Sequence, residues 1–484
     1  MAELTTSPTA ATGAANPATS STTASPAPGF RSLTEESEVE ALPLEGELPA
    51  WLAGSLIRTG PALWEAGEHP MRHWFDGFAM LHRFSFDQGS VSYASRFLET
   101  RAYRAARERG KLAYPEFATD PCRSLFQRVS SAFTPKLTDN PNVNLTRLGE
   151  RFVAMTETPI PVEFDPETLA AAGVAWKVPG MLTTAHPHRD RASGGMLNYA
   201  VKLGPRSSYR FFLVRPEATE PEVIGSVGVR EPAYMHSFGL TERWLVLAEF
   251  PFVVNPLKLA LGGRPYIENY HWKPSLGTRF TLVDRATGEA TGPFETDPFF
   301  CFHHVNAYED GDEVVVDLCA YPDAGIVEDL YLDRLRAGKP ITKPELRRFR
   351  VAPAAGTVAH ERLVEEPLEL PRINYSRASE RRYRYVWGTG AGETGWIDRI
   401  VRADLERRET TVWSEDGCYP GEPVFVAAPD AEGEDEGVLL SVVLDGRTEG
   451  SFLLVLDAAS LDELGRAQAP NRIPFGFHGQ FARG

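Results

Sequence analysis

Two stretches of the sequence decide the fold: AYMHSFGLTERWLVLAEF (233–250) and CFHHVNAYEDGDEVVVDLCAY (301–321). In each, a histidine-bearing run passes through a charged turn into an aliphatic run of the kind that forms a buried strand. The two units therefore predict two successive hairpins with a histidine at a similar place in each. Further strand-like runs bounded by turn residues are GSLIRTG (54–60), GSVSYASRFLET (89–100), RYRYVWGTG (382–390) and GVLLSVVLDG (437–446).

The rest of the chain continues this pattern, with 41 glycines and 38 prolines as punctuation. Helical patterns are few and short, near 125–133, 328–336 and 460–465. About 450 residues of strand and turn without an internal linker are too many for a single β-sandwich domain. A β-propeller of large blades or two sandwiches would fit this all-β pattern. The propeller is favoured because it leaves only short, protected strand edges.

Composition excludes several classes of protein. The chain has 484 residues, and no apolar run is long enough to predict a membrane-spanning helix. A net charge of -16 argues against nucleic acid as a partner, because phosphate binding needs a basic face. Four widely spaced cysteines (Cys122, Cys301, Cys319 and Cys418) without a CxxC pair argue against a disulfide framework or a thiolate zinc site. We therefore expect a cytoplasmic protein, and the sequence indicates no obligate protein partner.

The first 29 residues differ from the remainder in composition. They are rich in Ala, Thr, Ser and Pro and contain hardly a charge. They lack the basic start and the apolar core of a secretory signal. Such a segment buries too little apolar surface to offset its ordering entropy. We predict a disordered tail over residues 1–29 and a single propeller domain over residues 30–484.

Four histidine contexts stand out, because apolar, aromatic or small residues surround them. They are TTAHPHRD (183–190), AYMHSFG (233–239), FFCFHHVNAYE (299–309) and IPFGFHGQF (473–481). A single histidine usually has a surface role or a hydrogen-bonded place in the core. Four of them so far apart rule out a local helical site and suit ligands that converge from separate strands.

The chemistry of such a group narrows the choice of metal. Imidazole nitrogens suit zinc, copper, iron and nickel alike. Four histidines on an octahedral ion leave two positions open, which suits Fe(II) and O2. Three glutamates also lie within apolar sequence: Glu157 in RFVAMTETP, Glu369 in PLELPRINY and Glu422 in YPGEPVFV. Singly, each is more often solvent-facing, but metal-bound histidines commonly donate their second N–H to a carboxylate.

These histidines and glutamates lie in motifs in which the sequence resembles the carotenoid cleavage oxygenases. The resemblance extends from about residue 54 to residue 481. Within the family it is most similar to the animal-type branch of carotene oxygenases and the retinoid isomerase. The motifs that carry the likeness are HWFDGFAMLHRF (73–84), DPCRSLF (120–126), TAHPH (184–188), YMHSFGLTE (234–242), FHHVNAYE (302–309), ELPRINY (369–375), GEPVFV (421–426), EDEGVLLSVV (434–443) and FGFHG (475–479).

The resemblance implies a seven-bladed β-propeller with one Fe(2+) per chain on its axis, under a cap of helices and loops. It assigns the iron ligands to four histidines, His186, His236, His303 and His478. In both HPH and HH the first histidine matches the family pattern, so His188 and His304 are expected to be neighbours only.

The resemblance also assigns residues around the ligands. It pairs Glu157 with His236, Glu369 with His303 and Glu422 with His478, and it leaves His186 without a carboxylate. It places Val143 near the open coordination site, although an ordinary core valine is an equally good interpretation. Asp76 is expected to form a structural turn.

The implied reaction is cleavage of a conjugated C=C bond of a carotenoid or apocarotenoid by O2 into two aldehydes, with β-carotene 15,15′ cleavage to retinal as one form. Alternatives are a stilbene-cleaving oxygenase, a retinoid isomerase on the same iron, and a non-enzymatic propeller that only binds a partner. Stilbene-cleaving members carry a lysine at the position we match to Arg151, which disfavours that reaction.

Two stretches could contact the membrane that holds such a substrate. In RSLFQRVSSAF (123–133), one helical face would carry four apolar residues, Leu125, Phe126, Val129 and Phe133. The second stretch is FPFVVNPLKLALGG (250–263). Either could instead pack on the propeller. We expect a cytoplasmic protein that lies peripherally on the inner face of the membrane.

Overall fold

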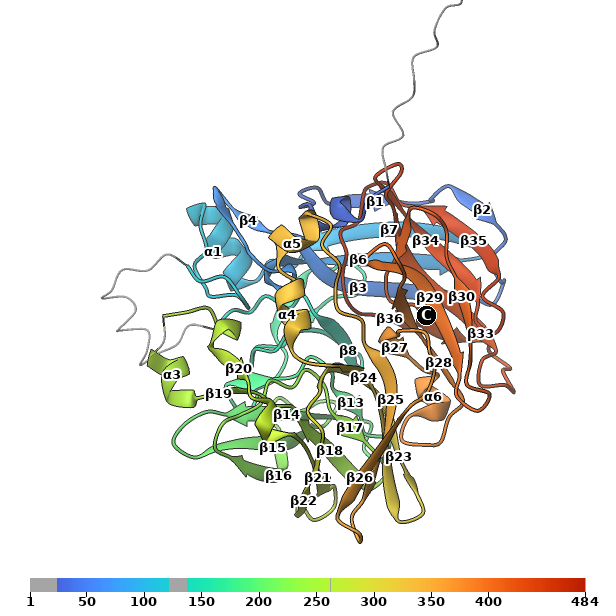
Figure 1. Ribbon diagram of the computed structural model, residues 1–484. Coiled ribbons are helices and arrows are strands. Elements are labelled where there is room, and N and C mark those ends of the chain that lie inside the picture. Colours follow the sequence, from blue (N-terminus) through green and yellow to red (C-terminus); the bar gives the residue numbers. More distant parts are fainter. Residues whose placement is uncertain (1–23, 122–136, 262, 484) are drawn as a thin grey trace, which may run out of the picture.

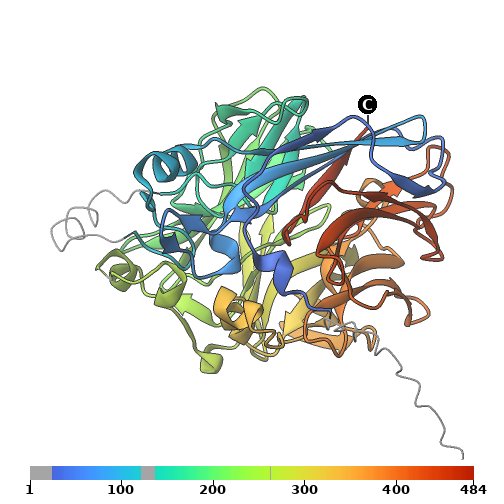
Figure 2. The same ribbon diagram turned by 90° about the horizontal axis from the view of Figure 1, so that it is seen from above.

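The computed structural model describes residues 24–121, 137–261 and 263–483. Within these residues, seven sheets of four to six strands follow one another around a common axis (Figures 1 and 2). The seven-bladed propeller that the sequence and the resemblance predict is therefore confirmed.

The first three blades are described here in the order of their strands across each sheet. Blade 1 consists of β1 (Ser37–Val39), β7 (Ser90–Phe97), β6 (Phe78–Asp87), β3 (Gly54–Leu63) and β36 (Gly479–Ala482). Blade 2 consists of β11 (Ala171–Val174), β10 (Val162–Phe164), β9 (Arg151–Met155) and β8 (Asn144–Leu148). Blade 3 consists of β16 (Glu222–Val229), β15 (Ser207–Val214) and β14 (Met196–Lys202), with β12 (Leu182–Thr183) and β13 (His188–Arg189) both paired to β14.

The remaining four blades follow the same plan. Blade 4 consists of β22 (Ala290–Thr296), β21 (Thr278–Asp284), β18 (Trp244–Glu249) and β17 (Gly239–Leu240). Blade 5 consists of β26 (Thr357–Arg362), β25 (Glu345–Ala352), β24 (Glu313–Tyr321) and β23 (Phe300–Asp310). Blade 6 consists of β30 (Glu409–Trp413), β29 (Ile397–Asp404), β28 (Tyr385–Ala391) and β27 (Glu369–Arg372). Blade 7 consists of β2 (Leu44–Gly46), β35 (Glu463–Gln468), β34 (Gly450–Asp457), β33 (Gly437–Asp445), β31 (Cys418–Pro420) and β32 (Val424–Ala427), the last two both paired to β33.

The two ends of the chain close the ring by exchanging strands. The C-terminal strand β36 pairs with β3 in blade 1, with Arg58 opposite Gly479. The N-terminal strand β2 pairs with β35 in blade 7, with Leu44 opposite Ala467. Each of these two blades therefore contains strands from both ends of the sequence, and the last strand is fixed beside the propeller axis.

Packing between blades explains why the middle strands are aliphatic on both faces. In β33 seven consecutive residues, from 438 to 444, are buried, and β34 is similar. Between blades 6 and 7, the rings of Trp387 and Phe425 stack with centroids 4.6 Å apart. Burial on both faces removes the alternation of apolar and polar residues that a half-exposed strand would show.

Short helices and two small hairpins form the cap. The helices are α1 (Arg101–Arg109), α3 (Pro256–Leu261), α4 (Gly325–Asp329), α5 (Leu332–Arg336) and α6 (Tyr375–Ala378), with 3-10 turns η1 (Ala27–Phe30), η2 (Trp74–Asp76), η3 (Ile267–Asn269) and η4 (Pro274–Leu276). The hairpins pair β4 (Glu65–Ala66) with β5 (His69–Pro70) and β19 (Phe252–Val254) with β20 (Tyr270–Trp272). In Figure 1, α1 and α3 lie on the left of the molecule, α4 and α5 lie near its middle, and α6 lies apart from them on the right.

The turn η2 is anchored by a buried carboxylate. Asp76 accepts hydrogen bonds from the backbone N–H of Arg72, His73 and Ala118 and from the hydroxyl of Thr119, at 2.6–3.2 Å. These four donors satisfy a group that would be costly to bury alone. Asp76 thus makes the structural turn expected for it.

Several helix predictions need correction. The segment 328–336 forms two helices, α4 and α5, instead of one. The helix near 460–465 is wrong: Asp457 accepts the backbone N–H groups of Ala459 and Ser460 in a turn, and β35 follows. Helix α1 was missed, although Thr100 caps its start and Gly110 ends it with φ of 63°. The helix predicted over 125–133 lies outside the described residues.

The predicted boundary of the tail at residue 29 falls inside η1. The backbone N–H of Phe475 donates to the carbonyl of Gly29 at 2.9 Å, and Pro28 and Gly29 are buried. These residues therefore pack on the propeller. Residues 1–23 lie outside the described part of the chain, and the single domain over residues 30–484 stays a prediction. Among the described residues, no helix is long and apolar enough to span a membrane.

Candidate metal centre

Four histidines from different blades meet on the propeller axis. His186 lies between β12 and β13, His236 precedes β17, His303 lies in β23 and His478 directly precedes β36. One ring nitrogen of each lies within 4.8 Å of those of the other three. The structure therefore brings together the four side chains that the resemblance assigned as ligands.

Hydrogen bonds to carboxylates fix the orientation of three of these rings. Nδ1 of His236 contacts Glu157 at 2.7 Å, Nδ1 of His303 contacts Glu369 at 2.5 Å, and Nδ1 of His478 contacts Glu422 at 2.7 Å. An ionised carboxylate can only accept, so Nδ1 carries the proton and Nε2 keeps a free lone pair. No carboxylate contacts His186 among the hydrogen bonds of the described residues. The three pairs are those that the resemblance assigned.

The spacing of the free nitrogens suits a single ion. Metal–imidazole bonds of about 2.0–2.1 Å place adjacent ligand nitrogens about 3 Å apart and opposite ones about 4 Å apart. The Nε2 atoms of His303 and His478 are 3.1 Å apart, yet neither can donate a proton to the other. Nε2 of His186 is buried and has no hydrogen-bond partner. These unprotonated, converging acceptors fit a cation between them.

Burial favours the neutral form of two of these histidines, His186 and His478. It lowers the pKa of His186 well below its usual range, and the neighbouring imidazoles lower it further. Burial also lowers the pKa of His478 to about 4, although Glu422 opposes the shift. Burial alone would raise the pKa of Glu422, but the charge of Arg372 and the contact with His478 lower it to about 2. At neutral pH His186 and His478 are thus unprotonated where a metal would need them.

The second histidines of the two histidine motifs have other partners. Nε2 of His188 contacts the carbonyl of Phe238 at 2.8 Å. Nδ1 of His304 contacts the hydroxyl of Ser237 at 2.8 Å. Neither residue belongs to the converging group. The geometry therefore agrees with the choice of His186 and His303.

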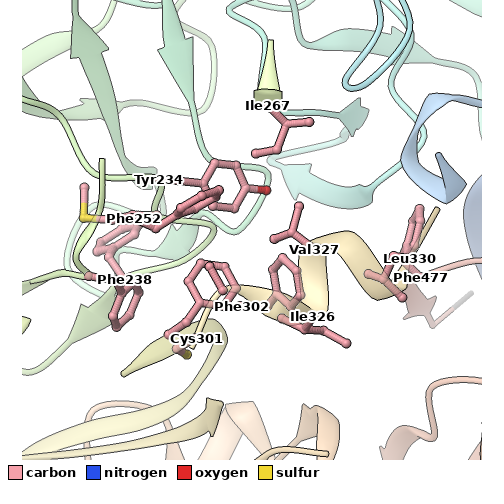
Figure 3. Packing of buried hydrophobic residues seen from close by; sticks show 14 of the residues in the cluster. Tyr234, Phe238, Phe252, Ile267, Cys301, Phe302, Ile326, Val327, Leu330 and Phe477 are labelled. Atoms are coloured by element: carbon pink, nitrogen blue, oxygen red, sulfur yellow. The ribbon is translucent and has the colours of Figure 1, made fainter. Parts of the chain in front are cut away.

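An apolar cavity opens onto this centre. The empty space of the cavity, counted together with the open solvent at its mouth, is about 730 Å³, and His236, His303 and His478 form part of its wall. The cap contributes Trp74 and Phe75 from η2 and Ile326 from α4. Figure 3 shows Ile326 and Leu330 of this region near Phe302 and Phe477. Further apolar lining comes from Ile341, Leu368, Leu370, Trp396 and Ile397.

Val143 and Leu370 also line this cavity. Val143, which is 5 % exposed, lines the cavity together with three of the histidines. Leu370 follows Glu369 with φ of 47°, a left-handed conformation that is strained for leucine. Its backbone N–H donates to Glu369 at 2.5 Å, so the strained residue helps to hold the carboxylate that orients His303.

The residues suggested for membrane contact are described only in part. Leu125, Phe126, Val129 and Phe133 lie outside the described residues. In the second stretch, α3 has Leu257 65 % exposed, next to an exposed Lys258.

Sequence reasoning missed contacts that complete the centre. The hydroxyl of Tyr234 donates to Glu157 at 2.9 Å, on the same oxygen that His236 contacts. The hydroxyl of Thr184 donates to the carbonyl of His236 and accepts the N–H of His186. Both residues lie two positions before a histidine of the group. This spacing is the one feature of the sequence that could have pointed to them.

The argument from Arg151 against stilbene cleavage does not hold. Its guanidinium donates to Glu163 at 2.9 Å and to the carbonyls of Ala175 and Ala218. Arg151 is not among the residues that line the cavity. Within the described part of the chain, the structure therefore gives no support to the use of this position as a guide to the substrate.

Nearly the whole chain is similar to known proteins. The family described as retinal pigment epithelial membrane protein, RPE65, matches residues 30–483. The carotenoid-cleaving dioxygenase, mitochondrial, of Macaca fascicularis is 36 % identical and covers 90 % of both chains. The β,β-carotene 15,15′-dioxygenase of Gallus gallus is 33 % identical, over 93 % of this chain and 97 % of its own.

Solved structures agree with this relationship. A mutant of Synechocystis apocarotenoid oxygenase superposes with a TM-score of 0.85 at 26 % identity, over 94 % of this chain and 98 % of its own. An ACO/RPE65 chimera gives the same TM-score at 27 % identity. The resemblance drawn from the sequence motifs is confirmed, and the chain belongs to the carotenoid cleavage oxygenase family.

Proposed function

We propose that this protein is a non-haem Fe(II) dioxygenase that cleaves a conjugated C=C bond of a carotenoid or apocarotenoid with O2 into two aldehydes. The observation that carries the proposal is the convergence of four imidazoles, three of which line an apolar cavity. The relatives named as carotenoid-cleaving and β-carotene 15,15′-dioxygenases support the same substrate class. Cleavage of β-carotene at the 15,15′ bond is the specific form that we propose to test first.

The residues present fit Fe(2+), one per chain, because their donor set is four imidazole nitrogens with Nε2 free. His186, His236, His303 and His478 would hold the ion, and their charge-neutral set would leave two positions open on an octahedral ion. When bound, the ferrous ion supplies the site at which O2 is activated. Glu157, Glu369 and Glu422 each keep the Nδ1 proton of their histidine in place and so fix the direction of the opposite nitrogen.

The cavity wall supplies orientation and exclusion of water. The ring of Phe75 packs against both Phe477 and Phe302, with ring centroids 5.0 Å and 5.9 Å apart. Such a wall suits a long hydrocarbon chain and offers water few partners. Val143 is proposed to fill space next to the open positions, which limits how closely the polyene approaches.

The place of the protein in the cell follows from its substrate. We propose a cytoplasmic protein with peripheral contact to the membrane that stores the polyene. The exposed Leu257 and Lys258 on α3 support such a contact. The named mitochondrial location belongs to the mammalian relatives.

The reaction is tested most directly with labelled oxygen. We expect the Fe(II)-loaded protein to convert β-carotene or an apocarotenal into aldehydes that carry ¹⁸O from ¹⁸O2 in both carbonyl groups, as measured by mass spectrometry with minimal exchange time. Resveratrol serves as the stilbene arm and a retinyl ester as the isomerase arm. Isomerised retinoid without O2 uptake, or no product from any of these compounds, would contradict the proposal.

The two histidines of the HPH motif, His186 and His188, can be replaced one at a time to test which of them binds iron. We expect His186→Ala to lose iron, because His186 is the histidine of blade 3 whose ring nitrogen faces those of the other three histidines. The matched variant His188→Ala removes a ring bonded to the Phe238 carbonyl and should keep close to one iron per chain. The iron content of each variant is measured by elemental analysis. Only folded, monodisperse protein is compared. The reverse pattern would show that the ligand has been misassigned.

The carboxylates are tested by Glu369→Gln. The amide removes the charge that holds Nδ1–H of His303, so we expect iron affinity or activity to fall roughly 10–100-fold. The dissociation constant for Fe(II) can be measured anaerobically by competition with a chelator. Glu366→Gln, three residues away in a contact with Arg399, is the control. Full iron content and undiminished turnover in Glu369→Gln would defeat this role.

A further inference from the structure

The ligand nearest to the end of the chain is held by an unusual number of contacts. His478 lies six residues before the C-terminus. The carbonyl of Phe477 accepts from Nη2 of Arg58 at 3.3 Å, and that of His478 accepts from the N–H of Thr59 at 3.3 Å. The N–H of Gly479 donates to Glu422 at 2.9 Å. Together these contacts hold the backbone on both sides of His478.

Arg58 approaches this segment from blade 1. It is only 6 % exposed, and it lies opposite Gly479 in the pairing of β3 with β36. A Cβ on Gly479 would lie 2.5 Å from Cγ of Arg58, and one on Gly421 would lie 3.1 Å from its Nη2. The two glycines therefore leave the space in which the buried guanidinium lies.

Arg372 approaches the same segment from blade 6. Its Nη2 donates to the carbonyl of Gly479 at 3.1 Å, and its Nη1 lies 3.6 Å from Oε1 of Glu422. The ring of Tyr375 lies 5.4 Å from its guanidinium carbon. Glu422 is wholly buried, so a nearby cation offsets the cost of its charge.

This arrangement distinguishes Glu422 from the other two carboxylates. Among the described residues, the ion pairs of Glu157 and Glu369 are with their histidines alone. Glu157 receives its further hydrogen bond from Tyr234, and Glu369 receives one from a backbone N–H. The cationic support is therefore confined to the side of the centre where the chain ends.

We propose that Arg58 and Arg372 are positioning residues that form a cationic clamp on residues 477–479 and thereby hold Nε2 of His478 toward the other three imidazoles. The clamp joins blades 1, 6 and 7 at the point where the ring closes. The inference rests on the proposed metal centre, because the orientation of His478 matters for function only if the imidazoles share an ion. Neither arginine contacts the substrate cavity, so neither is a catalytic residue.

The test compares Arg58→Gln and Arg372→Gln with the charge-conserving Arg372→Lys. A matched control is Arg348→Gln in blade 5, since Arg348 makes a buried two-point pair with Asp317 at 2.8 Å that does not touch the centre. Two quantities are measured for the full-length chain: the anaerobic dissociation constant for Fe(II), and hydrogen exchange of the peptide covering residues 474–484 in the metal-free protein.

We expect both glutamine variants to raise the dissociation constant about 10-fold or more, in the range of other residues that support metal ligands, and to speed exchange of the C-terminal peptide. Arg372→Lys should recover part of both effects. Arg348→Gln should lower the melting temperature but leave both quantities close to the wild-type values.

Wild-type behaviour of Arg372→Gln in both measurements would overturn the clamp, and so would equal changes in Arg348→Gln. If Arg58→Gln fails to fold, Arg372→Gln decides, because its side chain is 14 % exposed and the substitution is easier to accommodate. A wild-type protein that binds no Fe(II) would refute the metal centre. The exchange measurement would still decide whether the clamp holds the C-terminal segment.

Discussion

Three unprotonated imidazole nitrogens and the unpartnered Nε2 of His186 face one another in the interior of this protein. Buried acceptors without donors are costly, and like partial charges at 3.1 Å repel each other. A cation among them removes both costs at once. The propeller provides what this arrangement requires, because each blade brings one short segment to the axis and the rigid sheets behind it prevent the ring nitrogens from moving apart.

The surrounding groups divide this task. The carboxylates fix which nitrogen of three of the rings carries the proton, and burial favours the neutral form of His186 and His478. Cap elements then cover one side with aromatic and aliphatic side chains, so that the centre opens to a hydrocarbon-like space. The opposite arrangement, a polar open channel, would suit hydrolysis. Here, the combination of neutral ligands and an apolar cavity favours chemistry between O2 and a polyene.

Much of this could be predicted from the sequence, because the informative residues lie in compact motifs. The histidines and glutamates stand in apolar surroundings that mark them as buried, and the strand runs identify an all-β chain. The number of blades came from the family resemblance, since the blades vary too much to show a repeat of fixed period. Helix α1 also has local signals in the sequence, since Thr100 caps its start and Gly110 ends it, but the sequence analysis did not predict it.

Other features depend on contacts between distant segments, and no local pattern records them. The exchange of strands between the two chain ends, the contact of Tyr234 with Glu157 and the approach of Arg58 and Arg372 to His478 are of this kind. The argument from Arg151 lacks structural support for the same reason, because alignment gives a position along a strand but not the face toward which the side chain points.

The most direct test of the central claim is the anomalous diffraction of a crystal of the protein loaded anaerobically with Fe(II), measured on both sides of the iron absorption edge. The account predicts a single iron peak bonded to the Nε2 atoms of His186, His236, His303 and His478. An iron peak elsewhere, or four rings that keep their positions with no metal among them after loading, would contradict it.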